Sequence, residues 1–207
     1  MMSSTDKDDN DTLLRPRRRL SREERHRQLL DASRRLIREE GTDALTLGRL
    51  AEQAGVAKPV VYDHFGTRPG LLAELYREFD DRQTALMDTA LRESGPALSD
   101  KAKVMATAYI DCVLTQGREI PDVIAALASS PELEKIKHEC QAVFMDRCRS
   151  VLTPFVGAGT ITSASLWAML GAAETLSYAA ATGEITATQA ESELFEIILA
   201  MVARNVS

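Results

Sequence analysis

Four side chains between positions 58 and 68 carry hydrogen-bond donors in an arrangement that suits binding to a nucleic acid. Lys58 can donate to a guanine edge or to a phosphate, and Tyr62 and His64 can each donate to a phosphate oxygen. Arg68 adds a guanidinium that can bind a further phosphate. This chemistry is recognition of charge and of base edges, and it requires no nucleophile and no metal ion.

The stretch 46–65 predicts the two short helices that would hold these donors. Thr46 is a suitable N-cap, and its hydroxyl, together with the amides of the helix N-terminus, forms a candidate phosphate site. Gly55 suits the left-handed residue that ends a helix, and Pro59 suits the first turn of the next one. The first helix carries one apolar face, formed by Leu47, Leu50, Ala51 and Ala54.

Ala51, Gly55 and Val61 have the spacing of a helix-turn-helix, whose second helix enters the DNA major groove. Ala51 is small enough for the two helices to cross closely, and Val61 and Phe65 give the second helix a buried stripe. The same spacing also allows a helical hairpin in an all-α core, so the flanking residues decide between the two interpretations.

Those flanking residues resemble the DNA-binding region of the TetR family of bacterial transcription regulators. In that family the helix-turn-helix ends in a Tyr-x-His-Phe run, followed by a basic residue and a leucine-rich helix. The corresponding residues are Tyr62-Asp63-His64-Phe65, Arg68 and the run Leu71–Tyr76. The resemblance covers the N-terminal third of the chain. Asp63 departs from it, because the family often has an aromatic or polar residue at this position, and an acid facing phosphate is unfavourable. It implies that the DNA contacts include Lys58, Pro59, Val60, Tyr62 and His64.

The charges divide the chain into a basic segment and an acidic body. Residues 15–68 carry 13 Lys and Arg against 8 Asp and Glu, whereas residues 69–207 carry 11 against 19. This split favours a DNA-binding head on a separate regulatory body. Ahead of it, an expected disordered tail leads into Arg17, Arg18 and Arg19, which we interpret as an arm that contacts phosphate or the minor groove. A solvated charge run is the alternative.

Abundant Ala, Leu and Glu with few β-branched runs predict an all-α fold. We expect a tail and basic arm over 1–20, a helix-turn-helix domain over 21–66 and a helical regulatory and dimerisation domain over 67–207. A long helix from Thr67 to about Glu93, with Leu86 in its apolar stripe, should join the two, and Val143 is expected in the apolar stripe of the helix that ends at about Leu152. Further helices are expected around 121–128, from Ser130 to about Leu152, over 163–181 and over 188–205, the last opened by a capping box at Thr188 and Glu191.

The two C-terminal helices, at about 163–181 and 188–205, carry apolar stripes that suit either a core or a four-helix bundle with a second copy. Regulators that resemble the TetR family usually dimerise through their last two helices, which favours the homodimer. Two heads on a symmetric dimer would read a palindromic operator in double-stranded DNA.

The body is the expected sensor. Our hypothesis is that a small apolar effector enters between the long linking helix and the body helices, shifts the spacing of the heads and releases DNA. Methionine and aromatic side chains at helical spacing also suit an ordinary core, and Cys112 or Cys148 could sense oxidants. The candidate ligand contacts are Met87, Met105, Tyr109, Cys112, Phe144, Cys148, Trp167 and Met169.

Several classes of protein lack support in the sequence. The chain has no glycine-rich phosphate loop, no nucleophile elbow and no metal-ligand spacing, so we expect no enzyme, metal or cofactor. Its three cysteines suit a reducing cytoplasm, and no apolar run is long enough to span a membrane.

The sequence therefore predicts a ligand-responsive DNA-binding transcriptional regulator, a repressor that binds a palindromic operator as a homodimer and is released by a small molecule. The alternative is a non-catalytic helical dimeric adaptor without sequence-specific DNA binding. The sequence leaves open the effector, the operator and the regulated genes, and repression is the usual case among similar proteins.

Overall fold

The computed structural model describes residues 20–115, 123 and 131–206. These residues form helices and contain no strand, which confirms the predicted all-α fold. The elements are α1 (Arg22–Glu40), η1 (Thr42–Ala44), α2 (Leu47–Ala54), α3 (Lys58–Phe65), α4 (Arg68–Glu93), α5 (Leu98–Thr115), α7 (Pro131–Leu152), η2 (Thr153–Phe155), α8 (Ser163–Thr182) and α9 (Ala187–Arg204). The arm at Arg17–Arg19 and the helix expected around 121–128 lie outside the described residues.

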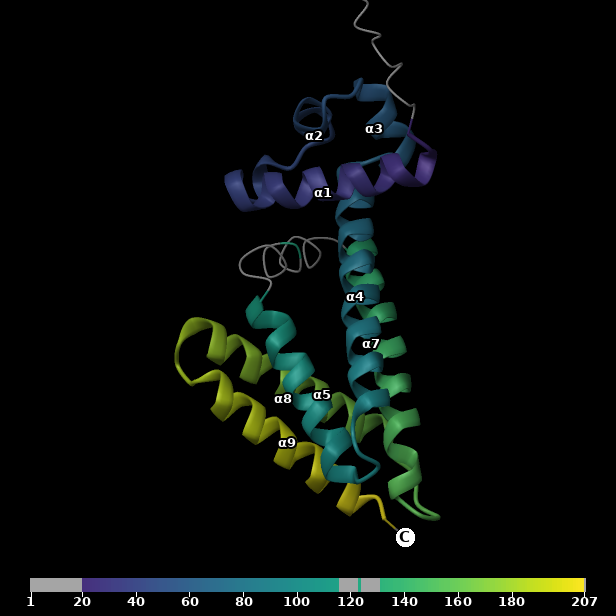
Figure 1. Cartoon of the computed structure of the whole chain (residues 1–207), viewed down its shortest axis with the longest axis vertical. Coiled ribbons are helices and arrows are strands. Elements are labelled where there is room, and N and C mark those ends of the chain that lie inside the picture. Colours follow the sequence, from purple (N-terminus) through teal and green to yellow (C-terminus); the bar gives the residue numbers. More distant parts are fainter. Residues whose placement is uncertain (1–19, 116–122, 124–130, 207) are drawn as a thin grey trace, which may run out of the picture.

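The helices are arranged as a head, a shaft and a body (Figure 1). The head consists of α1, α2 and α3 at one end of α4. The shaft is α4 itself, which runs from the head alongside α7. At the far end α5, α8 and α9 pack on one another and on the shaft.

Local signals set the two ends of α1. The Ser21 hydroxyl accepts from the Glu24 amide at 3.1 Å, and the Glu24 carboxylate accepts from the Ser21 amide at 2.7 Å, which completes a capping box. At the other end Gly41 has a φ of 84°, a value that favours glycine.

The shaft helix α4 contributes to two separate hydrophobic clusters. Thr67 caps its N-terminus by accepting from the Gly70 amide at 3.1 Å. The next turns bury Leu71, Leu72 and Leu75 among the apolar side chains of the head. Further along the helix, Met87 and Leu91 belong instead to the cluster of the body. A displacement of α4 therefore acts on the head and the body together.

Two apolar residues expected in buried stripes are exposed. Leu86 on α4 and Val143 on α7 each keep 60% of their surface accessible. Helical spacing alone assigned them to stripes, but the faces that pack are rotated from them. Beside Leu86, α4 buries Met87, and beside Val143, α7 buries Met145 and Cys148.

The expected capping box at Thr188 and Glu191 is wrong by two residues. The box is formed by Thr186 and Gln189, with the Thr186 hydroxyl accepting at 3.1 Å and the Gln189 side chain accepting at 2.9 Å. The residue before the cap, Ile185, packs against the hydrophobic cluster of the body, and this anchors the chain at that point. Helix α9 therefore begins at Ala187.

Candidate nucleic-acid interface and ligand cavity

The turn between α2 and α3 has the geometry of a helix-turn-helix. Thr46 caps α2 by accepting from the Arg49 amide at 3.1 Å, and Gly55 ends it in the left-handed region at φ 64°. Ala51 is buried at the crossing of the two helices. The predicted phosphate site at Thr46 thus lies at the exposed N-cap of α2, where the hydroxyl oxygen already accepts a hydrogen bond from the Arg49 amide.

Helix α3 buries one side and presents the other to solvent. Val61 and Phe65 pack into the head, with 0% and 7% of their surface exposed. On the opposite side Lys58 and Pro59 are exposed, and Tyr62 keeps 53% of its surface accessible. Of the other two predicted contacts on α3, Val60 and His64 are half-buried. The outward face of α3 therefore combines a cation, a phenol and apolar surface.

Lys58 leans against α2 at a glycine. A Cβ atom added to Gly48 would lie 3.7 Å from Lys58 Cε and 3.8 Å from Lys58 Nζ. The absence of a side chain at Gly48 leaves this space to the lysine stem. Sequence reasoning did not identify Gly48 as a neighbour of the predicted base contact, because the two residues are ten apart and on different helices.

His64 lies between α3 and α1 rather than fully outward. Its ring centroid is 5.5 Å from that of His26 and 6.0 Å from that of Phe65. Burial, with smaller effects from His26 and Arg22, lowers the pKa of His64. His26 in turn has its Nε2 atom 3.7 Å from the Glu74 carboxylate on α4. The imidazole of His64 can still donate one hydrogen bond when it is neutral.

Arg68 contacts the protein itself. Its Nε and Nη2 atoms donate to the carbonyl oxygens of Leu45 and Thr42, each at 2.8 Å. These carbonyls belong to the connection that leads from η1 into α2. The guanidinium therefore holds the start of the shaft to the start of the helix-turn-helix.

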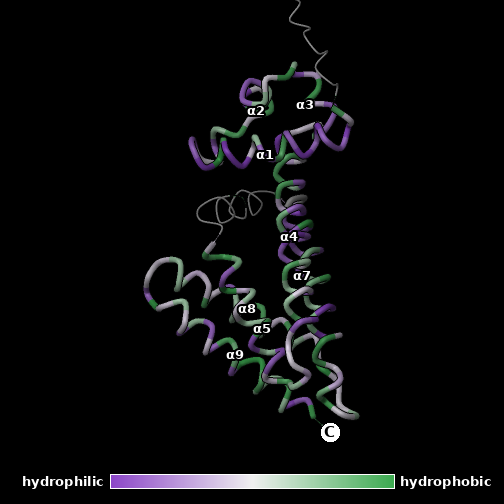
Figure 2. The backbone as a smooth tube through the Cα atoms, viewed as in Figure 1, coloured by the Kyte–Doolittle hydropathy of each residue, from purple (hydrophilic) through white to green (hydrophobic). Residues whose placement is uncertain are grey.

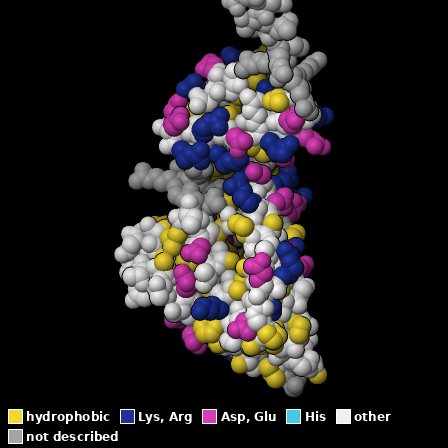
Figure 3. All heavy atoms as spheres, in the orientation of Figure 1, with side chains coloured by type: hydrophobic (Ala, Val, Ile, Leu, Met, Phe, Trp, Pro, Cys, Tyr) yellow, Lys and Arg dark blue, Asp and Glu magenta, His cyan; other side chains and the backbone are white. Residues whose placement is uncertain are grey.

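The surface of the head is rich in cations. In the space-filling view, dark blue Lys and Arg side chains gather over the head, and the body below is mostly uncharged with scattered acids (Figure 3). Some of these cations are paired with acids of the same domain, as Arg49 is with Glu40 at 2.5 Å. The residues of α1 are mostly hydrophilic, whereas those of α8 are mostly hydrophobic or of intermediate hydropathy (Figure 2).

A cavity of about 470 Å³ lies between α4, α5, α7 and α8. Four of the eight candidate ligand contacts line it, and these are Met87, Tyr109, Cys112 and Phe144. Met105, Cys148 and Met169 are buried in the body but are absent from its wall. Trp167 lies on the outer face of α8, where its ring stacks on His138 of α7 at a centroid distance of 5.2 Å.

The cavity wall also holds polar residues that sequence reasoning missed. Asp80, Gln83 and Thr84 follow Tyr76 on the same face of α4, and Ser177 lies opposite on α8. An acid within an otherwise apolar helical stripe was the available signal for Asp80, since Tyr76, Asp80, Thr84 and Met87 recur at spacings of three and four.

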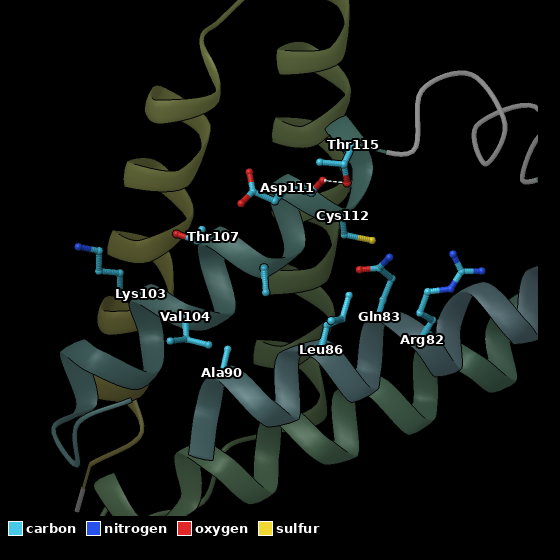
Figure 4. Close-up of a pocket in the computed structure, with 11 residues that line it drawn as sticks. Arg82, Gln83, Leu86, Ala90, Lys103, Val104, Thr107, Asp111, Cys112 and Thr115 are labelled. Atoms are coloured by element: carbon cyan, nitrogen blue, oxygen red, sulfur yellow. Dashed lines mark hydrogen bonds between the residues drawn. The ribbon is translucent and has the colours of Figure 1, made fainter. Parts of the chain in front are cut away.

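A second, more open hollow of about 680 Å³ runs between α4 and α5 (Figure 4). Leu86 and Ala90 line it from α4, and Val104 and Cys112 line it from α5. Gln83, Ala108 and Cys112 line both spaces, so these three residues mark where the hollow and the cavity approach each other.

The three thiols are held in their protonated form. Burial raises the pKa of Cys112 and of Cys148 to about 12, and that of Cys140 to about 11. Thiols of this kind react slowly, because the thiolate is the reactive species. Among the described residues, no group of three His, Cys, Asp or Glu side chains could hold a metal ion. None of the helices within the described ranges has the length and hydropathy needed to cross a membrane.

Comparison with known proteins identifies the N-terminal segment. Residues 29–82 match the model of the bacterial regulatory proteins of the tetR family. The chain is 42% identical over 64 residues to the HTH-type transcriptional activator FasR of Mycolicibacterium smegmatis, which is 30% of this chain and 29% of FasR. It is 36% identical over 62 residues to the HTH-type transcriptional repressor Rv1474c of Mycobacterium tuberculosis, which is 30% of this chain and 33% of that protein. The match thus spans about a third of each curated relative.

Solved structures share the fold over most of the chain. A putative TetR-family transcriptional regulator from Rhodococcus sp. superposes with a TM-score of 0.71 at 23% identity, over 86% of this chain and 99% of that one. The transcriptional regulator FadR from Bacillus subtilis, solved in complex with stearoyl-CoA, gives 0.69 at 16% identity, over 85% and 98%. At these identities the likeness is one of fold. Residues 29–82 therefore match the tetR family of bacterial regulatory proteins, and the described chain shares the fold of solved structures that include a putative TetR-family regulator.

Proposed function

We propose that this chain is a cytoplasmic transcriptional regulator that binds a palindromic operator as a homodimer. The observation that carries the proposal is the outward face of α3, on which Lys58, Pro59 and Tyr62 are exposed while Val61 and Phe65 fix the helix in the head. A helix held in this way can enter a major groove, with Lys58 at its N-terminal end near a base edge. The alternative of an adaptor gives no reason for these exposed donors.

The remaining candidate contacts take different roles in this proposal. Thr46 and the amides of the first turn of α2 bind phosphate, and Arg17, Arg18 and Arg19 bind phosphate or the adjoining minor groove. Val60 provides apolar contact, and His64 donates to a phosphate from its half-buried position. Arg68 acts indirectly, because its guanidinium is bound to the carbonyls of Thr42 and Leu45.

DNA binding is tested by selecting bound fragments from random DNA and measuring affinity for the selected site by fluorescence anisotropy. The double variant Lys58→Ala plus Tyr62→Ala should lose most of the affinity. Lys103→Ala, on the exposed side of α5 between two residues of the body cluster, Ala102 and Val104, is the control and should bind as the parent does. Equal affinity for the double variant and the parent would refute the proposal.

We assign the dimer interface to α8 and α9. Support comes from the outer face of α8, where Trp167 and Tyr178 keep 39% and 67% of their surface exposed, with Gly171 between them. Large apolar side chains on one exposed face suit a partner surface. A Cβ at Gly171 would meet no atom within 4 Å. The monomer can therefore accommodate Gly171→Arg, and the substitution should disrupt only the dimer. The oligomeric state of this variant, measured by analytical ultracentrifugation, tests the assignment. Ala85→Arg, on the exposed side of α4, is the control and should remain dimeric.

The effector would act through α4. This helix lines the cavity from Tyr76 to Met87, and its preceding turns hold Leu71, Leu72 and Leu75 in the core of the head. A ligand that binds better to one position of α4 therefore shifts the orientation of the head. The stearoyl-CoA complex of B. subtilis FadR supports a ligand-binding role for this fold.

We further propose that DNA binding represses transcription and that the effector relieves it. One of the two curated relatives is an activator and the other is a repressor, so the choice between repression and activation requires its own experiment. A reporter gene behind the selected operator should rise in expression when the regulator is deleted. A fall would establish activation instead.

A further inference from the structure

The carboxylate of Asp80 lies in the wall of the cavity without a direct partner. Among the described residues it has no hydrogen bond and no ion pair. The cation in charge interaction with it is Arg147, whose guanidinium is bound to Asp88. Burial, with a smaller effect from Asp81, raises the pKa of Asp80 to about 6. At neutral pH the cavity therefore contains a negative charge that no described residue pairs with directly.

The other charges on the cavity wall neutralise each other. Glu174 on α8 lies 3.4 Å from the ammonium of Lys137 on α7, and it also accepts from the Gln141 amide at 2.9 Å. Lys137 is thus committed to Glu174, and the residues that line the cavity carry a net negative charge, located at Asp80. An anionic ligand would meet repulsion there, whereas a cation would restore the balance.

Aromatic rings surround the same space. Tyr76 and Phe79 line the cavity from α4, and Tyr109 and Phe144 line it from α5 and α7. The rings of Tyr109 and Phe144 meet at a centroid distance of 5.7 Å and an interplanar angle of 56°. Aromatic faces attract organic cations, most strongly where water is excluded.

Ser177 adds an unpaired donor and acceptor. Its side chain lines the cavity and is 1% exposed, and its hydroxyl has no hydrogen-bond partner within residues 20–115, 123 and 131–206. A buried hydroxyl in this state destabilises the protein, and a ligand that hydrogen-bonds to it relieves the cost. Ser177 and Asp80 are on different helices, α8 and α4, so both walls of the cavity present an unpartnered polar group.

We infer that the cavity binds a lipophilic organic cation, with its ammonium group against Asp80 and the surrounding aromatic rings and its apolar part along Met87 and Leu170. The inference rests on the proposed function, because it names the chemical class of the effector. Primary and quaternary ammonium compounds both belong to this class, because both carry the positive charge that Asp80 would attract.

The test compares three linear ten-carbon compounds that differ only in the head group. Binding of decyltrimethylammonium, decanol and decanoate to the full chain is measured by titration calorimetry at pH 7.5, below the micelle concentrations. We expect the ammonium compound to bind about tenfold more tightly than decanol, as a desolvated cation–π and carboxylate contact would give. Decanoate should bind most weakly.

Two neighbouring substitutions separate the role of Asp80 from general electrostatics. Asp80→Asn keeps the shape of the side chain and should lower the affinity for decyltrimethylammonium about tenfold, with little change for decanol. Asp81→Asn removes the same charge from the exposed neighbouring residue and should leave both affinities unchanged. Thermal unfolding of each variant confirms that the fold is intact. Equal loss in both variants, or no loss in Asp80→Asn, would overturn the inference.

Operator binding by the same samples distinguishes this inference from the proposed function. If decanol or decanoate binds as tightly as the ammonium compound and releases operator DNA, the regulator stands and the cation class is wrong. If the ammonium compound binds through Asp80 while no operator can be selected, the ligand class stands and the regulator proposal fails. Absence of binding by all three compounds would overturn the inference.

Discussion

Arg68, the first residue of α4, donates from its Nε atom to the carbonyl oxygen of Leu45, which lies 23 residues earlier in the chain, at 2.8 Å. A second bond from Nη2 reaches Thr42. These bonds tie the shaft to the start of the helix-turn-helix, so the guanidinium has a structural role in the head.

Arg68→Ala should lower the free energy of unfolding by about 1.5–3 kcal/mol, because it removes charge-assisted hydrogen bonds from partly buried carbonyls. Urea denaturation measures the change. Arg77→Ala is the control, since Arg77 is an exposed residue on α4 that pairs with Glu74, and its loss should cost less than about 1 kcal/mol. Similar values for the two variants would contradict the structural role of Arg68.

Two glycines of the helix-turn-helix should respond to alanine in opposite directions. Gly48 lies in the first turns of α2, and a Cβ there makes ordinary contact with Lys58, so Gly48→Ala should stabilise the protein by about 0.5–1 kcal/mol. Gly55 has a φ of 64°, so Gly55→Ala should destabilise it by about 1 kcal/mol. Thermal unfolding of both variants tests the pair, and a shift of the same sign in both would be inconsistent with this backbone geometry.

His64 should make the head sensitive to acid. Its pKa is lowered, chiefly by burial and then by His26 and Arg22, so protonation disfavours the folded state. The stability that neutral His64 contributes is present above its ordinary pKa and is lost as the pH falls through the lowered value. Other groups around it are Arg25 and Asp63, and Glu74 lies beside His26.

The measurement is the urea midpoint at pH 7.5 and at pH 5. His64→Gln should lose less stability over this range than the parent does. His138→Gln alters an exposed residue of α7 and should follow the parent curve. Parallel losses in His64→Gln and the parent would argue against a lowered pKa at His64.

Asp80 should change the stability of the protein with pH in the opposite direction to His64. Its folded pKa of about 6 exceeds the ordinary value of 3.8, so the folded state holds the proton more strongly between these two values. The ionised carboxylate therefore opposes folding increasingly as the pH rises from 4 to 6. In the absence of ligand, Asp80→Asn should raise the free energy of unfolding at pH 7.5 by about 1–2 kcal/mol after allowance for partial solvation.

This gain should diminish at pH 5, where Asp80 of the folded parent is largely protonated. The groups in charge interaction with Asp80 are Asp81 and Arg147. Chemical denaturation at the two pH values checks the difference. Asp81→Asn serves as the comparison, and a gain in Asp80→Asn that did not depend on pH would exclude this explanation.

The thiols should be slow to react in the folded protein. With pKa values raised to about 12 for Cys112 and Cys148 and about 11 for Cys140, the thiolate fraction at pH 7.5 is very small. Labelling with a disulfide reagent, followed by mass spectrometry, should show modification far slower than in urea. Rapid labelling of Cys112 in the folded state would revive a redox role for this residue.

Local signals in the sequence predicted the scaffold of the head. Thr46, Gly55 and Pro59 act through contacts within one turn, so their types alone indicated where α2 ends and α3 begins. The spacing of four residues between Val61 and Phe65 identified the buried side of α3, and thereby its outward side. The same local reasoning placed the final capping box two residues late, because two similar patterns overlap and only the packing of Ile185 selects the one at Thr186.

The tertiary structure decided which faces meet. Periodicity could not determine how far each helix rotates about its axis, so Leu86 and Val143 were assigned to stripes that the packing leaves exposed. The bonds of Arg68 to Leu45 and the unpaired state of Asp80 depend on residues far away in the sequence. A cavity formed by four helices exists only once those helices have packed, and no contact within a single helix encodes it.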